Sequence, residues 1–349
     1  MAYYIRMRGK FYTTSESAWS AMLGSIMGAK ESIYLEMYIF DGDTTGYDFL
    51  RELGIKARAG LRVVVILDAL GSFGLANESI EELKSAGAEI LFFSYWLRRT
   101  HRKMLIIDEQ IVFLGGVNIS KQFVRWKDLQ VRVSGRVAKL AVRSFAHIYK
   151  ECGGKNPALV FTKEPKFIGR ARTWFLESGV RKKFLGLRAH YTEHIGGATR
   201  TITLVTPYLV PHPWMVTCLH LAIQRGVRVT IILPKKTDHA YFDRLNYYYA
   251  DQFEKLGVRC LLGKEMNHAK VMLVDGAIGT MGSQNIDTLS FDWNVEAGIF
   301  FDDPLMIAEL SKIIGIWTAE AEEFVALRYT PKWYDGLLAY VLRIFQRAP

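Results

Sequence analysis

The sequence is poor in cysteine and contains no long apolar run. Its three cysteines, Cys152, Cys218 and Cys260, are far apart and form no Cys-x-x-Cys pair, which argues against a disulfide framework and against a zinc-thiolate site. The N-terminus lacks an apolar signal core, and no segment reaches the roughly 18 apolar residues of a membrane span. These absences predict a cytoplasmic protein with no segment that crosses a membrane.

Basic residues are in excess, and they give the chain a net charge of +10 and a pI near 9.3. We therefore expect an anionic partner, either a membrane surface rich in acidic lipid or a nucleic acid, and charge alone does not separate the two. With 349 residues, 50% of them hydrophobic, the chain can bury a large core and form one to three domains. The sequence gives no basis for an oligomeric state.

One pattern occurs twice, from His101 to Asn118 and from His268 to Asn285. Both copies read His-x-Lys-x4-Asp, then an apolar run, two small residues, a spacer and Asn. Chance predicts roughly 0.1 copies of the His-x-Lys-x4-Asp part in a chain of this composition. The shared positions are His101, Lys103, Asp108, Gly115, Gly116 and Asn118 in the first copy, and His268, Lys270, Asp275, Gly282, Ser283 and Asn285 in the second.

Each copy is expected to form a β-hairpin. The runs 104–107 and 271–274 are β-branched and aliphatic, so the histidine and lysine of each copy, two residues apart, should share a face. Asp108 and Asp275 lie where polar residues separate two apolar strands, and we assign them a structural role in the turn. Gly116 and Ser283 are expected to leave room for a substrate's oxygens, and Asn118 and Asn285 to donate amide hydrogen bonds.

Two histidines, two lysines and two asparagines suit a phosphate site that needs no metal and no cofactor. The lysines and amides can neutralise the oxygens of a phosphodiester, one imidazole can attack phosphorus, and the other can protonate the leaving alkoxide. The reaction then passes through a phosphohistidine. A carboxylate follows each histidine at a matching offset, Asp128 and Glu296, and could hold the far nitrogen of an imidazole.

The duplicated motif resembles the phospholipase D superfamily, and the surrounding sequence is similar to its bacterial cardiolipin synthase branch, over roughly residues 12 to 320. That resemblance implies one active site formed by both motifs, with His101 as nucleophile, His268 as general acid and no metal. The segments that carry it are Met-Tyr-Ile-Phe at 37 to 40 behind Glu36, Arg99-Thr-His-Arg-Lys103, Thr206-Pro-Tyr-Leu-Val-Pro211, Pro234-Lys-Lys-Thr-Asp-His239, and Asn285-Ile-Asp-Thr-Leu-Ser290 followed by Asn294 and Glu296.

Helical and strand-like patterns alternate in the same order in both parts of the chain. Helices are predicted for 15–29, 47–59, 78–86, 138–151, 214–225 and 241–256, and strands for 32–40, 61–67, 90–93, 201–205, 227–233 and 258–262. This order predicts an α/β fold: two pseudo-symmetric α/β/α sandwich halves with mixed sheets that share one active site at their interface. We expect the first half at 1–150, a linker at 151–195, the second half at 196–330 and an amphipathic tail at 331–349.

Three segments combine aromatic and basic residues. The stretch 163–188 is interpreted either as a solvated linker or as a surface that enters lipid headgroups. Trp96 and Arg99, close before His101, admit the same two readings, and their position favours contact with a lipid substrate. The tail from Pro331 either packs on the body or forms an interfacial helix.

The remaining candidates are less specific. Glu36 is an acid in an apolar strand at the edge of the expected site; it forms a salt bridge in the site wall, or it orients an active-site cation or a substrate hydroxyl. His212 and His239 lie in segments that match the family near the substrate opening. The other histidines fall in no metal-ligand spacing.

These observations lead to one main hypothesis, a peripheral enzyme of the inner face of the cell membrane that makes cardiolipin from phosphatidylglycerol. Its expected partners are anionic phospholipids and the membrane surface, with no nucleic acid. A phospholipase D hydrolase or a metal-independent nuclease would use the same chemistry, and a catalytically silent lipid-binding scaffold is the alternative of another class. The aromatic and basic segments favour lipid over nucleic acid, since a nuclease groove depends more on cations.

Overall fold

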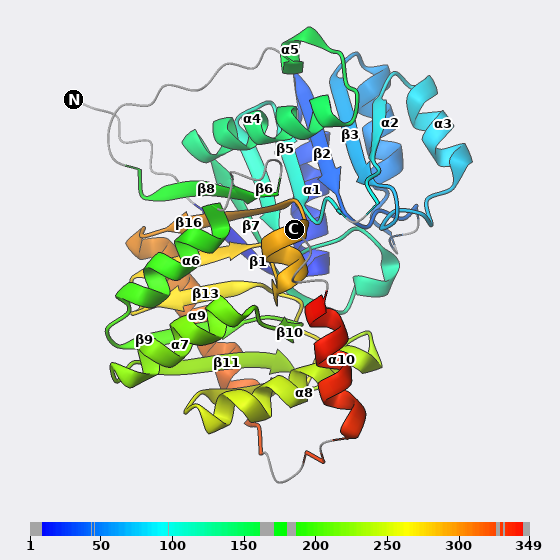
Figure 1. Ribbon diagram of the computed structural model, residues 1–349. Helices are drawn as coiled ribbons and strands as arrows, with labels where there is room; N and C mark the ends of the chain where they lie inside the picture. The colour runs from blue at the N-terminus through cyan, green and yellow to red at the C-terminus, as the bar shows by residue number, and fades with distance from the viewer. Residues whose placement is uncertain are drawn as a thin grey trace, which may run out of the picture. The chain divides into compact units, whose positions relative to one another are not determined.

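The computed structural model describes residues 9–42, 44, 46–96, 98–160, 171–179, 186–325, 329–330 and 332–344 (Figure 1). The contacts between residues divide the chain into two compact units. The first comprises residues 1–125 and 129–175, and the second comprises residues 126–128 and 176–349. Each unit is an α/β structure with a mixed sheet, so the predicted fold class is confirmed.

The first unit alternates helices and strands up to its motif hairpin, which β5 and β6 form. Thr14 caps the first helix, because its side chain accepts a hydrogen bond from the Ser17 N–H and the Ser17 hydroxyl accepts one from the Thr14 N–H. The elements are β1 (Lys10–Thr14), α1 (Ser15–Met27), β2 (Ser32–Met37), α2 (Phe49–Arg58), β3 (Arg62–Asp68), α3 (Asn77–Ser85), β4 (Glu89–Phe93), β5 (Lys103–Ile107), β6 (Ile111–Gly115), η1 (Lys121–Phe123), β7 (Lys127–Ser134), α4 (Arg136–Glu151) and α5 (Pro157–Val160).

Seven strands form the first sheet, in the order β1-β7-β6-β5-β2-β3-β4. Strands β2, β3 and β4 are parallel, whereas β5 is antiparallel to both β2 and β6. Helix α4 lies in front of the strands and α1 behind them (Figure 1). On the α4 side, Tyr34 of β2 stacks on Phe145 at a centroid distance of 5.2 Å. Strand β3 is buried on both faces, as its continuous apolar run predicted, and β2, which was predicted from alternation, is buried along its whole length as well.

The second unit repeats this plan around a motif hairpin formed by β13 and β14. Its first sheet strands, β9 and β11, are parallel, as β2 and β3 are. The elements are β8 (Thr173–Ser178), α6 (Gly186–Gly197), β9 (Thr201–Val205), β10 (Leu209–Val210), α7 (Pro213–Gln224), β11 (Arg228–Pro234), α8 (Ala240–Lys255), β12 (Arg259–Gly263), β13 (Val271–Val274), β14 (Ile278–Gly282), β15 (Ile286–Asp287), η2 (Leu289–Trp293), β16 (Glu296–Phe301), α9 (Pro304–Glu320), β17 (Ala321–Glu323) and α10 (Trp333–Ile344).

Eight strands form the second large sheet, in the order β17-β12-β11-β9-β13-β14-β16-β8, and β10 pairs with β15 in a small parallel sheet. Buried side chains of α6, α7 and α8 share one apolar core with this sheet, among them Tyr191, Leu219 and Phe253. Helix α9 instead contacts β12 and β14. In the part of the chain that the structure describes, no helix is long and apolar enough to span a membrane.

The two sheets keep the same register around their motifs. In the first, Glu36 lies opposite Met104 on one side and Ile66 on the other. In the second, Val205 lies opposite Val271 and Ile232. Because Met104 and Val271 each come three residues after the motif histidine (104 − 101 and 271 − 268), positions in one unit can be matched to positions in the other.

The predicted order of helices and strands is found in both units, with ends displaced by at most three residues, as at β2, which ends at 37 and not 40. The sequence did not predict β1, β8, α6 and α9. Strands β1 and β8 lie at the ends of their sheets. An edge strand pairs on one side only, so it needs no long apolar run and leaves a weak sequence signal.

Candidate active site

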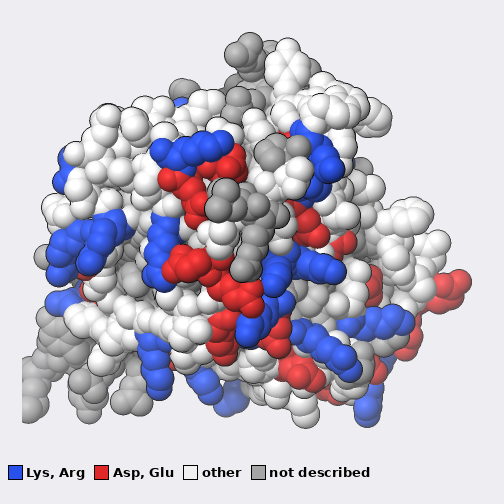
Figure 2. Space-filling view, turned by 90° about the horizontal axis from the view of Figure 1, so that it is seen from below, with Lys and Arg blue, Asp and Glu red and all other residues white. Residues whose placement is uncertain are grey.

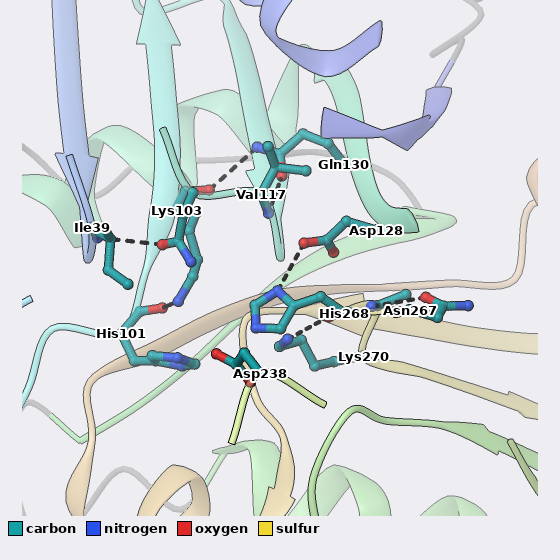
Figure 3. A network of polar contacts seen from close by, with 12 residues as sticks. Ile39, His101, Lys103, Val117, Asp128, Gln130, Asp238, Asn267, His268 and Lys270 are labelled. Atoms are coloured by element: carbon teal, nitrogen blue, oxygen red, sulfur yellow. Dashed lines mark hydrogen bonds and ion pairs between the residues drawn. The ribbon is translucent and has the colours of Figure 1, made fainter. Parts of the chain in front are cut away.

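The first motif begins in a loop and enters its strand only at Lys103. The Lys103 side chain turns back, and its Nζ donates a hydrogen bond to the His101 carbonyl oxygen at 2.5 Å (Figure 3). The same Nζ lies 4.7 Å from the centre of the Tyr38 ring, which also packs edge-on against His101 at 4.8 Å. His101 and Lys103 are therefore held as one buried group, although the strand alternation expected for them does not extend to His101.

Two buried carboxylates fix the loop on both sides of His101. The Thr100 backbone N–H donates to Asp68 Oδ2 at 2.9 Å, and its hydroxyl donates to Glu36 Oε1 at 2.5 Å. On the other side of the histidine, Arg102 Nη1 lies 3.5 Å from Glu36 Oε2, and neither of these side chains has any exposed surface. Burial raises the pKa of Asp68, against the opposing effect of backbone N–H donors.

This burial changes the role of Glu36. The sequence suggested a salt bridge in the site wall, or the orientation of an active-site cation or a substrate hydroxyl, and a fully buried carboxylate bonded to Thr100 and Arg102 presents no surface to a substrate. The geometry matches the interpretation of Glu36 as part of a salt bridge, which it forms with Arg102.

The second motif shows the same turn of lysine onto histidine, because Lys270 Nζ donates to the His268 carbonyl oxygen. The His268 imidazole is held by Asp128, whose Oδ2 lies 2.8 Å from Nδ1 (Figure 3). The rings of Trp126 and Tyr208 lie 5.3 and 6.2 Å from the imidazole. A carboxylate on Nδ1 fixes the orientation of the imidazole and favours its protonated form.

Asp128 lies in a short segment, residues 126–128, that packs with the second unit although the residues before and after it pack with the first. Lys127 forms a parallel bridge with Asn267, with the His268 N–H donating to the Lys127 carbonyl at 2.7 Å. Lys127 Nζ pairs with Glu265 at 3.0 Å and with Glu320 at 2.5 Å. The matching offsets suggested that Asp128 could hold the far nitrogen of an imidazole, and the imidazole that it bonds is that of His268.

The residues that end each hairpin are more tightly enclosed than expected. A Cβ on Gly115 would lie 2.1 Å from the Leu129 carbonyl oxygen, and one on Gly282 would lie 2.4 Å from that of Ala297. These glycines therefore make room for the neighbouring strand, and not for a ligand. The Gly116 N–H is likewise bonded to the Leu129 carbonyl at 3.0 Å.

Ser283 has no exposed surface, and its hydroxyl donates to the Glu296 carboxylate. Ser283 therefore presents no surface to a substrate, and its hydroxyl is already bonded within the protein. Glu296 is itself fully buried at the start of β16.

The two motif asparagines differ in their bonding. Asn118 Oδ1 accepts the Ile39 N–H at 3.3 Å, and the Asn118 carbonyl accepts the indole N–H of Trp19 at 2.8 Å. Asn285 Oδ1 is buried and has no hydrogen-bond partner among the described residues. The second asparagine is thus the one with an unused polar atom.

Both motif aspartates lie in the hairpin turns and bond to backbone. Asp108 accepts the N–H groups of Lys30, Glu31 and Ser32. Asp275 accepts those of residues 199, 200 and 201. Burial alone would raise the pKa of Asp275, but these donors outweigh it and lower the pKa to about 2.

Lys270 carries the main electrostatic feature of the second motif. Burial lowers its pKa to about 8, while Asp128, Glu296, Asp287 and Asp238 act in the opposite direction. No group of three or more histidine, cysteine, aspartate or glutamate side chains that could hold a metal occurs among the described residues.

The outlying candidates take different places. Trp96 is 90% exposed, and Arg99 Nη1 donates to the carbonyl oxygens of Tyr95 and Arg98 at 2.8 and 3.1 Å. His212 caps α7, accepting the Trp214 N–H at 3.2 Å, and His239 Nε2 lies 3.5 Å from Asp238. Most of the basic and aromatic stretch 163–188 lies outside the described residues.

Sequence reasoning missed three residues that the structure places around the motifs: Asp68, Arg102 and Asp238. Arg102 had a visible signal, because the residue between histidine and lysine is an arginine in the first copy and Ala269 in the second. Asp68 ends a buried strand, where an acid is unexpected unless it has a partner.

Comparison with known proteins agrees with the duplicated plan. The family described as "Cardiolipin synthase, PLD-like domain" matches residues 22–148 and again residues 191–317. The cardiolipin synthase of Listeria welshimeri serovar 6b is 29% identical over 86% of this chain and 67% of that protein. That of Geobacillus kaustophilus is 30% identical over 82% of this chain and 61% of its own length.

The fold is similar to that of solved structures. Phosphatidylserine synthase of Haemophilus influenzae Rd KW20 matches with a TM-score of 0.75 at 15% identity, over 97% of this chain and 93% of that one. Polyphosphate kinase of Porphyromonas gingivalis matches with a TM-score of 0.65 at 14% identity, over 97% of this chain and 53% of that one. With its domain present in two copies, the chain belongs to the cardiolipin synthase family of phospholipase D-like enzymes.

Proposed function

We propose that the chain is a phosphatidyltransferase that makes cardiolipin from two molecules of phosphatidylglycerol. His101 attacks the phosphorus of the first lipid, and the bond from phosphorus to the glycerol headgroup breaks. His268 gives its proton to the departing glycerol oxygen and then takes the proton from a hydroxyl of the second lipid. That hydroxyl oxygen displaces His101 from phosphorus, so one glycerol is released and both histidines return to their starting states.

The observation that carries this proposal is the bond between Asp128 and His268 Nδ1 in the second unit, together with the histidine-lysine pair of the same design that the first unit contains. A carboxylate on Nδ1 stabilises the imidazolium and leaves Nε2–H to be donated, as a general acid requires. Lys103 and Lys270 supply positive charge for the phosphate oxygens. Membership of the cardiolipin synthase family supports a lipid phosphodiester as the substrate.

A membrane substrate is further supported by exposed apolar side chains in the first unit. We define the apolar rim as Leu70, Phe73 and Trp96, which are 61%, 87% and 90% exposed. Leu70 and Phe73 follow β3, and Trp96 follows β4, and because these strands are parallel neighbours their C-terminal ends lie at one edge of the sheet. The loop to His101 leaves from the same edge. Aromatic side chains beside cations such as Arg98 and Arg99 suit the headgroup region of an anionic bilayer.

Helix α10 offers a second apolar surface, with Trp333, Leu337 and Tyr340 exposed. The helix is fastened to the second unit through Asp335, which accepts hydrogen bonds from Arg244 Nε at 3.0 Å and from the Tyr329 hydroxyl at 2.6 Å. On the face drawn in Figure 2, basic and acidic side chains of the described residues intermingle. These features favour a lipid surface over a nucleic acid, which would need a basic groove.

The test is to incubate the protein with phosphatidylglycerol vesicles and to measure cardiolipin and free glycerol. We expect the two products in equal amounts, and the same rate in EDTA, because lysines supply the charge that a metal ion would otherwise bring. His101→Ala and His268→Ala are the matched inactive controls.

Each alternative has its own outcome in this test. Phosphatidic acid and glycerol without cardiolipin would identify a hydrolase. Vesicle binding without turnover would identify a scaffold, and cleavage of DNA in EDTA with no lipid product would identify a nuclease. Loss of activity in EDTA that one divalent cation restores would overturn the proposed chemistry.

A further inference from the structure

A carboxylate that no motif contains lies beside the second histidine. Asp238 follows β11, and its Oδ1 accepts the hydroxyl of Tyr208 at 2.5 Å. The Tyr208 ring lies 6.2 Å from the His268 ring and stacks on Phe242 at 4.1 Å. Figure 3 shows Asp238 beside Lys270, and the negative charge of Asp238 favours the protonated form of that lysine. The Asp238 side chain is 29% exposed, so a ligand can reach it.

The first unit has no acid at the matching place. By the register of the two sheets, Pro234 corresponds to Asp68, and four residues further along the chain Asp238 corresponds to Ser72. Ser72 is buried and bonded to backbone, since its hydroxyl donates to the Tyr38 carbonyl and accepts the Phe40 N–H. The exposed carboxylate is therefore particular to the second unit and is not required by the fold.

A negative charge does not help to bind a phosphate, because it repels the phosphate oxygens. A carboxylate is, however, a strong acceptor for hydroxyl groups. An ammonium ligand is disfavoured, since it would stand against Lys270 and against the proton that His268 must carry. A neutral headgroup with several hydroxyls satisfies the carboxylate without this repulsion.

We propose that Asp238, held by Tyr208, binds a hydroxyl of the acceptor alcohol and selects a polyol headgroup over water. This role rests on the proposed transferase function. One hydroxyl of the polyol bonds to Asp238 while a neighbouring hydroxyl gives its proton to His268 and attacks phosphorus. Asp238 itself takes no part in breaking or forming bonds.

The experiment uses phosphatidyl-p-nitrophenol as the donor and free glycerol as the acceptor. Release of p-nitrophenol reports the first step, while the ratio of phosphatidylglycerol to phosphatidic acid reports the choice between glycerol and water. For Asp238→Asn, which keeps an oxygen for Tyr208, we expect that ratio to fall about 10- to 100-fold, the effect of losing a charged hydrogen bond. The apparent KM for glycerol should rise accordingly.

Asp251→Asn is the matched control, because Asp251 bonds Lys255 and Gln252 near the other end of α8. It should leave the product ratio at the wild-type value. Methanol serves as a second acceptor; with a single hydroxyl it cannot bridge Asp238 and His268, so its transfer should change less than threefold in Asp238→Asn.

Three results would overturn the inference. One is an unchanged product ratio in Asp238→Asn. Another is an effect on the chemical steps, seen either as an equal loss of transfer to glycerol and to methanol or as a slower release of p-nitrophenol. The third is a greater loss with ethanolamine than with glycerol, which would identify an ammonium site. If the wild-type protein transfers to no alcohol, the proposed function fails before this test begins.

Discussion

The side chains that surround the two motif histidines differ. Around His101, the backbone is fastened on both sides, because Asp68 and Glu36 hold Thr100 and Glu36 also pairs with Arg102. At the matching places the second unit has Pro234, Val205 and Ala269, none of which can form such bonds. In the second unit, Asp128 bonds the His268 imidazole.

Their surroundings differ as well. The loops after β3 and β4 in the first unit carry the apolar rim. The corresponding loops after β11 and β12 in the second unit carry charged residues, among them Lys235, Asp238 and Glu265. An apolar edge suits the lipid that stays attached to the enzyme, and a polar edge with an acid suits the alcohol that leaves or enters. The comparison therefore favours His101 as nucleophile and His268 as acid, in agreement with the resemblance noted from the sequence.

Replacing each histidine tests this division of roles most directly. His101→Ala should lower turnover by at least about 10⁴-fold for any donor, since no covalent intermediate can form. His268→Ala should lower it by about 10²–10⁴-fold for phosphatidylglycerol but far less for phosphatidyl-p-nitrophenol, whose leaving group needs no acid. The measurements are single-turnover rates and acid-quench trapping of labelled phosphohistidine. A label on residue 268 would exchange the two roles.

Asp128→Asn should have the next largest effect, a loss of about 10²-fold or more with phosphatidylglycerol, within the range of a general acid's contribution. Removing a negative charge beside an imidazole disfavours the protonated ring, so the alkaline limb of the pH–rate profile should move to lower pH. Asp251→Asn is the control for the chemical change. If neither the rate nor the pH of the alkaline limb changes in Asp128→Asn, Asp128 does not stabilise the protonated form of His268.

The fold and the chemical groups could be predicted from the sequence because both depend on local patterns. Apolar runs of strand length and helical periodicity fixed the order of elements, and the repeated spacing of histidine, lysine and asparagine identified the motifs. The turn positions of Asp108 and Asp275 followed from polar residues between two apolar runs.

What could not be predicted depends on distant contacts. Offset along the chain marked Asp128 as an acceptor for an imidazole without saying which one, and the bridge between Lys127 and Asn267 brings it to His268. The burial of Glu36 and Ser283 likewise follows from partners elsewhere, Arg102 and Glu296. Sequence spacing gives the face of a strand, but it does not say what covers that face.

Breaking the buried ion pair of the first unit should reduce stability more than activity per folded molecule. Glu36→Gln leaves the Arg102 guanidinium buried without its counter-charge, which costs about 3–5 kcal/mol of unfolding free energy. The double variant Glu36→Val with Arg102→Met makes both positions uncharged, as the matching positions Val205 and Ala269 of the second unit are, and it should recover much of that lost unfolding free energy. Urea unfolding measures both, with Glu81→Gln, from an exposed pair with Lys84, as the control. A single variant that costs below about 1 kcal/mol would contradict the assigned role.

Lys270 of the second motif predicts an effect of pH on donor cleavage. With a pKa of about 8, its ammonium loses its proton above that pH, so donor cleavage should slow as pH rises from 8 to 10. Phosphatidyl-p-nitrophenol isolates this effect because its cleavage needs no acid from His268. The folded pKa lies below the ordinary 10.5, so the unfolded chain binds more protons between these values and the unfolding free energy should rise with pH there. A flat rate over this range would show that the Lys270 charge is not used.

The smallest expected effect distinguishes the two apolar surfaces. Trp96→Ala in the apolar rim and Trp333→Ala on α10 should each weaken binding to anionic vesicles by about 1 kcal/mol, or about fivefold, through the loss of one inserted side chain. If the first unit receives the donor lipid, Trp96→Ala should also raise the KM for vesicle-bound phosphatidylglycerol, whereas Trp333→Ala should change binding alone. Leu305→Ala, an exposed apolar residue outside both surfaces, is the control in vesicle sedimentation. Equal effects of the two tryptophans on KM would mean that the apolar rim has no special relation to the donor, and the contrast between the units would then lie only in the buried ion pair of the first unit and in Asp238 of the second.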